Sequence, residues 1–471
     1  MSDEQPEPAA QKQLGLWDTV SIIIGIVIGA GVYETAPFIL QNVPNAAVGI
    51  GVWVLGGVLS LIGALCYAEL ASTYPRSGGD YVYLTRAFAP SVGFLFGWAQ
   101  LSVILTGSIG MMAYVFADYA VVLFDLGQGV TWMYACGAVA VLSVANIAGA
   151  VTGKITQNVL TGLKILGLTA IFVAGLFFGS GATIEAPSAV TGSGSLGLAM
   201  ILVLYTYGGW NDAAFVAAEM RDPKRNIPRA LLLGTGAITL IYVAINLAYI
   251  VGLGFEGARS SRAIAADVLG LSFGDAGKKL MSVVVMISAL GAVNGLIYTG
   301  SRIYASMGGD HSVFQRLGRW HPRLGTPVWS LAAQGAFALL LVVVVGTTFG
   351  QGAIDGFLTS LGLSPAKWQG HGGFDTLLKC TAPVFWMFFL LTGISLFVLR
   401  HRDRNLPRAF SVPLYPVVPL LFCATSLYML YSATTYAGSL TLVGLLPLLL
   451  GAPLYFASSR RSSSEVPDEP T

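Results

Sequence analysis

The chain has 471 residues, of which 55% are hydrophobic and only 10% charged, and its mean hydropathy is +0.72. A soluble domain carries about 25% charged residues, so this composition excludes a protein whose surface lies mainly in water. The formal net charge of +2 gives no reason to expect a nucleic-acid partner.

Apolar runs long enough to cross a bilayer core of roughly 30 Å recur along the whole chain. They predict an all-α polytopic membrane protein with twelve transmembrane helices in one membrane domain, residues 17–457, between tails at 1–16 and 458–471. The predicted helices are 17–40, 47–72, 91–117, 131–150, 155–179, 196–218, 227–253, 279–306, 327–347, 374–399, 412–432 and 438–457.

Most of the 25 Lys and Arg residues fall in the two tails or in loops that lie on the same side as the tails. Because positive charge accumulates in cytoplasmic loops, this distribution predicts that both termini are cytoplasmic. The polar, partly acidic first residues do not have the pattern of a secretory signal. The expected location is the plasma (inner) membrane, with several crossings.

Features that would indicate an enzyme or a nucleotide-driven pump are missing from the sequence. The four cysteines and four histidines are scattered, without metal or redox spacing. No glycine-rich stretch is followed by the Lys-Ser/Thr pair that binds nucleotide phosphates. We therefore expect no enzyme activity, no metal and no cofactor. Pore-lining rings that would indicate a channel are also absent.

Two predicted helices are interrupted by glycine. Residues 25–38 read GIVIGAGVYETAPF, with Gly29, Ala30 and Gly31 in helix 1, and residues 202–216 read LVLYTYGGWNDAAFV, with Gly208 and Gly209 in helix 6. Broken helices at corresponding positions of two five-helix units are typical of inverted-repeat transporters. The repeats would be 17–179 and 196–399, with the last two helices, 412–457, peripheral.

An unwound helix inside a membrane is tolerated where a ligand, water or protein satisfies its backbone groups. The N–H groups that open the second half of helix 1 would bind a carboxylate. The carbonyls around Tyr205–Tyr207 would accept from an ammonium group. Together they predict a site for the head group of an α-amino acid. The alternative is that the glycines only permit close helix packing, which is the better interpretation for Gly25.

Each break is followed by a carboxylate. Glu34 lies three positions after Gly31, and Asp212 lies three positions after Gly209. The first turn of a helix favours negative charge, so both residues have an ordinary interpretation as helix caps. The alternative is contact with a cationic part of the substrate or with a coupling proton.

Several segments resemble one transporter family. GIVIGAGVY is similar to the first-helix signature of the amino acid–polyamine–organocation (APC) superfamily, and YTYGGWNDAAFVAAEMRDPKRNIPRA resembles its L-type amino acid transporter (LAT) branch. Matching segments follow in order at 74–84, 291–310, 321–330 and 396–416. The resemblance covers about residues 15–430.

This resemblance implies a LeuT-type fold with a 5+5 inverted repeat and an amino acid as substrate, carried by alternating access. Gly29, Ala30 and Gly31 would hold its carboxylate. Tyr205 would take the place of the gating aromatic of helix 6. The remaining residues around the second break would line the pocket or lie just behind it: Tyr207, Gly208, Gly209, Trp210 and Asn211.

Lys164 lies about ten residues inside helix 5, too deep to reach water easily, so it is expected to face the protein interior and to mark function. The resemblance implies a more specific role, because sodium-independent APC members place a lysine ammonium where relatives bind sodium, between helices 1 and 8. Ser288, Asn294 and Thr299 are the polar candidates beside it on helix 8. For Lys379 the alternatives are contact with the outer interface and a place in the outer vestibule.

Three departures from the animal L-type pattern matter. Residues 118–130 contain no cysteine, so no disulfide-linked heavy chain is expected. Residues 348–373 form a long connection that is expected to act as an outer lid. Glu34 and Asp212 stand where most relatives are uncharged, which keeps cationic amino acids, amines and polyamines open as substrates. A transporter-like sensor is the other alternative. The cycle is expected to be sodium-independent, with proton symport, exchange and facilitated diffusion left open.

Overall fold

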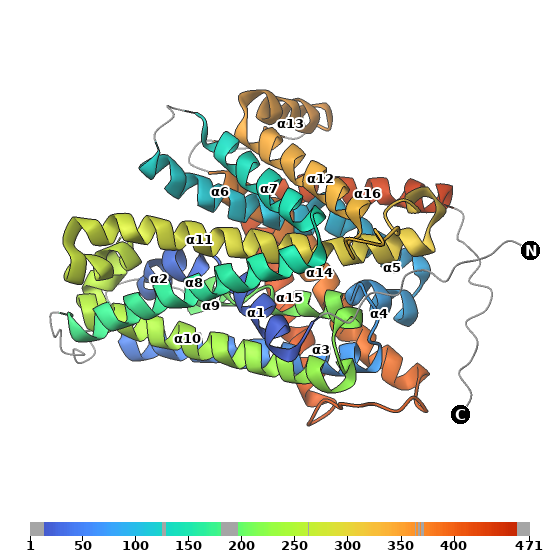
Figure 1. Cartoon of the computed structure of the whole chain (residues 1–471), viewed down its shortest axis with the longest axis horizontal. Helices are drawn as coiled ribbons and strands as arrows, with labels where there is room; N and C mark the ends of the chain where they lie inside the picture. Colours follow the sequence, from blue (N-terminus) through green and yellow to red (C-terminus); the bar gives the residue numbers. More distant parts are fainter. Residues whose placement is uncertain are drawn as a thin grey trace, which may run out of the picture.

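A computed structural model describes residues 14–124, 129–179, 196–261, 263–362, 364–365, 368 and 372–458, and it contains helices with no strand among these residues. The helices α3 (Ala46–Thr73), α8 (Ala150–Phe177), α10 (Pro223–Ser260) and α11 (Ile264–Asp310) run roughly side by side along the longest axis of the molecule, and α11 and α10 are the longest helices described (Figure 1). The predicted all-α architecture is therefore confirmed.

The first half of the chain forms shorter helices around the first break. Their bounds are α1 (Leu16–Val27), α2 (Gly31–Gln41), α3 (Ala46–Thr73), α4 (Asp80–Ala87), α5 (Pro90–Ala99), the π-helix η1 (Gln100–Ile104), α6 (Leu105–Leu123), α7 (Thr131–Ile147) and α8 (Ala150–Phe177). The second half contains α9 (Leu196–Thr206), the 3₁₀ helix η2 (Trp210–Glu219), α10 (Pro223–Ser260), α11 (Ile264–Asp310), the 3₁₀ turn η3 (Ser312–Phe314), α12 (Val328–Gly346), α13 (Thr348–Ser360), α14 (Gly373–Arg402), α15 (Val417–Ala437) and α16 (Leu440–Ala457).

Each predicted span coincides with one helix or with two or three helices that follow each other. In the described part of the chain, nine single or joined helices are long and apolar enough to cross a membrane, while α1 and α7 are apolar but shorter. The chain is therefore a multi-pass membrane protein, and the count of twelve crossings stays a prediction. On α3 the exposed side chains include Val54, Leu55 and Val58, as expected for a surface that faces lipid.

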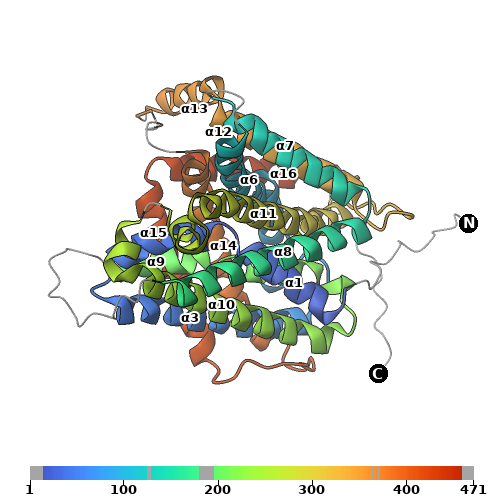
Figure 2. The ribbon, with the colours of Figure 1, turned by 60° about the vertical axis from the view of Figure 1, so that its left-hand side comes forward.

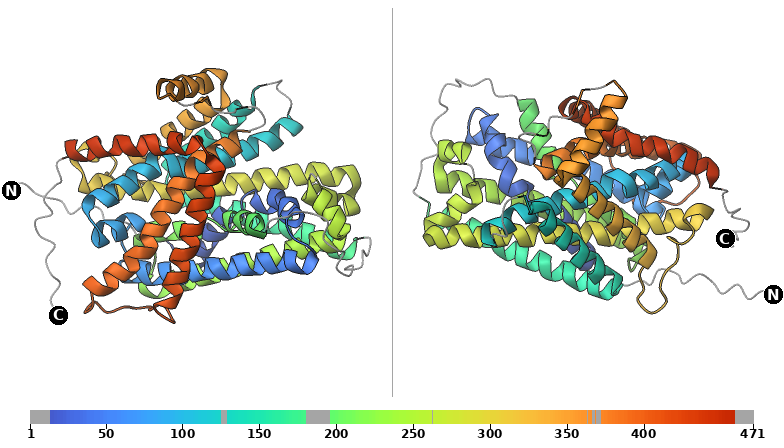
Figure 3. Two further views of the ribbon diagram at one scale, coloured as in Figure 1. Left: turned by 180° about the vertical axis from the view of Figure 1, so that it is seen from behind. Right: turned by 90° about the horizontal axis from the view of Figure 1, so that it is seen from above.

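The broken helices lie inside the bundle. α1 packs against α8, α10 and α11, and α9 packs against α2 and α3. Turning the molecule shows α8, α10 and α11 passing alongside α1 (Figure 2). Seen from behind, the C-terminal helices cover one side, with α15 packed on α14 (Figure 3). The segments with the most unusual backbone are therefore enclosed by regular helices.

Both predicted breaks are present. α1 and α2 are separated by residues 28–30, and α9 and η2 by residues 207–209. The predicted span 196–218 is not α-helical throughout, because everything after the second break is 3₁₀ helix. The two breaks open the two predicted repeats, whose symmetry stays a prediction.

The connections contain more helix than the sequence indicated. Residues 254–278, expected to lie outside the membrane, are largely helical, and non-helical backbone at Gly254 and Gly274 marks kinks near the predicted span ends. Residues 348–360 form α13, which stands at the edge of the molecule and packs on α12 (Figures 1 and 2).

Candidate functional site

The first break is held by side chains from two neighbouring helices. Lys164 on α8 is fully buried, and its Nζ donates to the carbonyl oxygen of Gly25 at 2.8 Å and to that of Ile28. Ser288 on α11 donates its hydroxyl to the carbonyls of Ile28 at 2.9 Å and Gly29 at 3.1 Å. Carbonyls that leave the α-helical pattern inside a membrane need such partners, so these two side chains stabilise the unwound turn.

Space for the lysine is provided by α11. A Cβ at Gly291 would lie 3.3 Å from Nζ of Lys164, so a larger residue there would compete with the ammonium group. Gly25 serves close packing, as the sequence suggested, because a Cβ there would lie 1.8 Å from Nε2 of Gln157.

The start of α2 exposes backbone rather than side chains. The first N–H groups of an α-helix have no partner within the helix and carry a partial positive charge. Neither glycine leaves room for a side chain here. A Cβ on Gly29 would meet Sδ of Met112 at 2.9 Å, and one on Gly31 would meet the side chain of Thr206 at 3.0 Å. The turn can therefore bring backbone N–H groups close to a small anion.

The second break depends on a positive backbone angle. Gly209 has φ +106°, a conformation that side-chain-bearing residues rarely adopt, and a Cβ there would lie 2.7 Å from Ile26. The two breaks share one hydroxyl: Tyr242 on α10 lies 2.9 Å from the carbonyl oxygen of Val27 and 3.1 Å from that of Thr206. The ends of α1 and α9 are thus joined through a single side chain.

A cavity of about 140 Å³ lies between the two breaks and the helices α6, α11 and α14. Its wall is mostly apolar. It includes Gly29, Gly31, Tyr205, Gly208, Gly209 and Asp212 from the predicted site. Tyr205 lines the cavity, and its ring lies 6.3 Å from that of Phe374 on α14.

Other predicted site residues lie elsewhere. Tyr207 points away from the cavity and donates its hydroxyl to the carbonyl of Trp53 at 3.0 Å. Trp210 packs edge-on against Tyr67, and with Asn211 it lines a separate pocket of about 30 Å³. Ala30 is buried and is not part of the cavity wall.

The polar candidates on α11 do not all gather around Lys164. Ser288 does, through the shared carbonyl of Ile28. Asn294 instead donates to Gln157 at 2.9 Å and accepts from Asn146 at 2.8 Å, and Thr299 donates to the carbonyl of Gly295 within its own helix.

The remaining charged candidates have separate environments. Glu34 is in α2, but its side chain lies outside the described residues. Asp212 is in the first turn of η2, as predicted, and accepts from Asn211 at 3.1 Å. Lys379 is buried, forms an ion pair of 2.7 Å with Asp375 and lies 4.9 Å from the ring of Tyr436.

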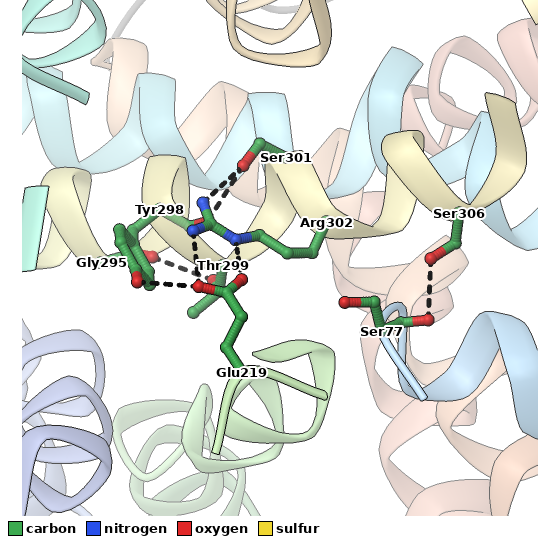
Figure 4. A network of polar contacts seen from close by, with 8 residues as sticks. All are labelled: Ser77, Glu219, Gly295, Tyr298, Thr299, Ser301, Arg302 and Ser306. Atoms are coloured by element: carbon green, nitrogen blue, oxygen red, sulfur yellow. Dashed lines mark hydrogen bonds and ion pairs between the residues drawn. The ribbon is translucent and has the colours of Figure 1, made fainter. Parts of the chain in front are cut away.

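A buried ion pair lies beyond the second break, at the end of η2 and close to the beginning of α1. Arg302 on α11 donates to Glu219 at 2.6 Å and 3.0 Å, and Tyr298 donates to the same carboxylate at 3.2 Å (Figure 4). Both charged side chains are almost completely buried. Next to them, the N–H of Leu14 donates to the carbonyl of Glu219 at 3.0 Å, so the beginning of α1 is fastened to the end of η2.

Sequence reasoning missed this pair and also missed Gln100, which lines the cavity from the start of the π-helix. A signal for Arg302 and Glu219 was available, because ionisable residues within apolar spans are usually functional and paired. No simple sequence signal predicts a π-helix.

Helices too apolar for water, two of them broken around a shared cavity, are the architecture of a membrane transporter. The chain belongs to the amino acid permease family, whose model matches residues 14–449. It is 30% identical to the serine/threonine exchanger SteT of Bacillus subtilis (strain 168), over 96% of this chain and 98% of that protein.

Two mammalian relatives are similar over most of their length. Human b(0,+)-type amino acid transporter 1 is 28% identical over 91% of this chain and 84% of that protein. The mouse large neutral amino acids transporter small subunit 2 is 27% identical over 97% of this chain and 84% of that protein. The predicted membership of the APC superfamily, near its L-type branch, is confirmed. The protein is a secondary amino acid transporter, and its relatives are transporters and exchangers rather than enzymes.

Proposed function

We propose that the cavity between the two breaks binds the head group of an α-amino acid and that the protein carries it by alternating access. The observation that supports this most directly is that one cavity touches Gly29, Gly31 and Gly208 from both breaks. The N–H groups at the start of α2 bind the substrate carboxylate, since a helix N-terminus favours an anion.

In this proposal the substrate ammonium group binds carbonyl oxygens at the end of α9. Those of Tyr205 and Thr206 already accept from the N–H of Gly208 at 3.0 Å and from Tyr242 at 3.1 Å. A carbonyl oxygen has two lone pairs and can accept once more. The ring of Tyr205 then closes over the bound molecule.

We assign to Lys164 the role of a fixed cation that replaces sodium at the first break. Its contacts to Gly25 and Ile28, next to those of Ser288, support this assignment. Uptake into proteoliposomes should then be equal when external sodium is replaced by choline. A loss of most of the uptake in choline would contradict the assignment.

In this proposal the protein exchanges one amino acid for another, as the name of the relative SteT states for that protein. Proton symport is the alternative. Preloading liposomes with unlabelled substrate should then accelerate uptake of labelled substrate severalfold. Acceleration by an inward proton gradient without internal substrate would instead indicate symport.

We infer the membrane location and the subunit composition of the transporter from its charge distribution and its sequence. We propose a bacterial inner-membrane location with both termini cytoplasmic, as the distribution of Lys and Arg predicts. The name of the mouse relative describes it as a small subunit. Since residues 118–130 here contain no cysteine, we propose that this chain works without a disulfide-linked second subunit. The repeats at 17–179 and 196–399 and the role of α13 in an outer lid belong to the same proposal.

The experiment that tests the function is a ligand screen followed by a flux measurement. Purified protein is heated with each of the twenty amino acids. A ligand that binds the folded state raises the free energy of unfolding by RT ln(1 + [L]/Kd), and the melting temperature rises with it. The amino acids that stabilise it should also be taken up saturably by proteoliposomes. Stabilisation without flux would indicate a sensor, and no stabilisation by any amino acid would contradict the proposed site.

A further inference from the structure

Asp212 and Gln100 both line the cavity, and the two residues are only 6% and 4% exposed. Both lie near Tyr304 on α11, whose hydroxyl donates to the backbone carbonyl of Gln100 at 3.2 Å and which interacts electrostatically with Asp212. Together they form the polar end of the cavity wall. The Oε1 atom of Gln100 has no hydrogen-bond partner among the described residues, and the Asp212 carboxyl accepts from Asn211 through Oδ1 at 3.1 Å.

Two segments of unusual backbone produce this polar end. Gln100 begins the π-helix η1, and Ile104, which ends it, also lines the cavity. Asp212 lies in the first turn of the 3₁₀ helix η2. Single-turn π-helices inside α-helices occur frequently at functional sites. Two independent irregularities thus direct acceptor oxygens toward one cavity.

The charged and titratable groups around Asp212 do not neutralise it. Asp80 at the start of α4 and Tyr304 on α11 interact with it electrostatically. Asp80 is itself buried and accepts hydrogen bonds of 2.5 Å from Tyr67 on α3 and from Thr392 on α14. The backbone next to it is tied to η2 by a hydrogen bond of 3.0 Å from the N–H of Gly78 to the carbonyl of Phe215.

The buried cations of neighbouring helices are already engaged. Arg302 on α11 is paired with Glu219, and Lys164 on α8 is bound to the carbonyls of α1. The other helices packed on η2 are α1, α3 and α10. On α3 the charged residue Glu69 is paired with Arg400 and Arg408. The described charges of α1 and α10 lie near the helix ends, at Asp18 on α1 and at the 224–229 and 256–259 stretches of α10. A buried carboxylate without a cation costs several kcal/mol, so a cation supplied by the ligand would bind here favourably.

We propose that this polar end recognises a positively charged substrate side chain, so that the transporter takes basic amino acids with a terminal ammonium or guanidinium group. The inference rests on the proposed function, which places the substrate head group at the breaks. Apolar residues between the two ends, such as Met111, Met112 and Leu105, would contact the methylene groups. Asp212 pairs with the terminal cation and Gln100 accepts a hydrogen bond from it.

The test compares ligands of equal shape and different charge on the full-length protein in lipid nanodiscs. L-lysine should bind at least tenfold more tightly than L-norleucine, and L-arginine at least tenfold more tightly than L-citrulline. Asp212→Asn should abolish both preferences, lowering the affinity for lysine and arginine at least tenfold more than the affinity for norleucine and citrulline. The matched control is Asp275→Asn, an exposed acid on α11 that lies roughly 30 Å from the cavity residue Leu296 at 1.5 Å per residue; it should keep both preferences.

A second variant covers the case in which Asp212→Asn does not fold. Gln100→Leu removes an unpartnered acceptor and should weaken lysine binding at least threefold without weakening norleucine. Equal affinity for lysine and norleucine in the unmodified protein would overturn the proposal. So would an equal loss of both ligands in Asp212→Asn, which would assign the carboxylate to the α-amino group. Loss of proton-driven uptake of neutral amino acids, with lysine never bound, would assign it to a proton and overturn the proposal as well.

Cadaverine, which is lysine without its carboxylate, separates this inference from the proposed function. Much weaker binding of cadaverine than of lysine supports the carboxylate site at Gly29 and Gly31. If cadaverine binds as tightly as lysine, and Asp212→Asn weakens both, the polar end is correct and the head-group site is wrong.

Discussion

The two helix breaks both interrupt the hydrogen bonds of a buried helix backbone, and different residues compensate for this at each break. At the first break a buried ammonium group and a hydroxyl, from Lys164 and Ser288, bind the carbonyls that the helix no longer uses. At the second break the chain turns at a glycine with positive φ, and the following segment is 3₁₀ helix with a carboxylate open to the cavity. The first break carries its own cation, while the second presents a carboxyl group to the cavity, so the site has one side fixed by the protein and one side that can respond to a ligand.

The largest loss of stability is expected from a substitution in the buried ion pair between Arg302 and Glu219, beyond the second break. Arg302→Met leaves Glu219 buried without its cation and should lower the free energy of unfolding by about 3–5 kcal/mol. Thermal unfolding in detergent measures the loss. The double variant Glu219→Gln/Arg302→Met should recover most of it, and a double variant as unstable as the single one would show that the loss does not come from the unpaired charge.

Removing the cation of the first break should come next. Lys164→Ala leaves the carbonyl of Gly25 without its side-chain donor, at about 1–3 kcal/mol, while the carbonyl of Ile28 keeps only Ser288. Amino acid uptake should fall at least tenfold because the turn at Gly29 loses its support. Lys154→Ala, on the same helix but partly exposed and 3.6 Å from Asp18, is the control and should transport nearly normally. Unchanged transport by Lys164→Ala would contradict the fixed-cation role.

The glycines of the two breaks should respond differently to alanine. Gly209→Ala forces a side chain into positive φ, at about 1–2 kcal/mol, and adds a close contact with Ile26. In Gly29→Ala the new methyl meets the flexible end of Met112, which can move, so the melting temperature should change less while substrate affinity falls. Equal destabilisation would show that the two turns are equally strained.

The smallest expected effect concerns the link between the breaks. Tyr242→Phe removes the hydroxyl near Val27 and Thr206 and should cost about 1 kcal/mol of stability. Tyr249→Phe is the matched control, since that buried hydroxyl on the same helix has no hydrogen-bond partner in the described part of the chain. The Tyr249 variant should be as stable as the parent protein, and a larger loss there than at Tyr242 would contradict the link.

The sequence predicted the backbone of this site better than its side chains. Hydropathy and the glycine pairs predicted the helices and both breaks, because these depend on local properties such as apolar length and steric freedom. The depth of Lys164 in helix 5 predicted a buried lysine. Side-chain direction depends on packing, so the outward turn of Tyr207 toward Trp53 and the separation of Asn294 from Lys164 could not be predicted. The π-helix that presents Gln100 is likewise a product of tertiary packing.

The phenol of Tyr242 has one proton but lies within bonding distance of two acceptors, one on each broken helix. At any moment the hydroxyl can donate fully to only one of the two carbonyls, and the other carbonyl is then free to accept from another donor. An ammonium group arriving at the end of α9 would satisfy Thr206 and release the phenol to Val27. Binding of a substrate at the end of α9 would in this way change the hydrogen bonding at the end of α1, through the hydroxyl of Tyr242.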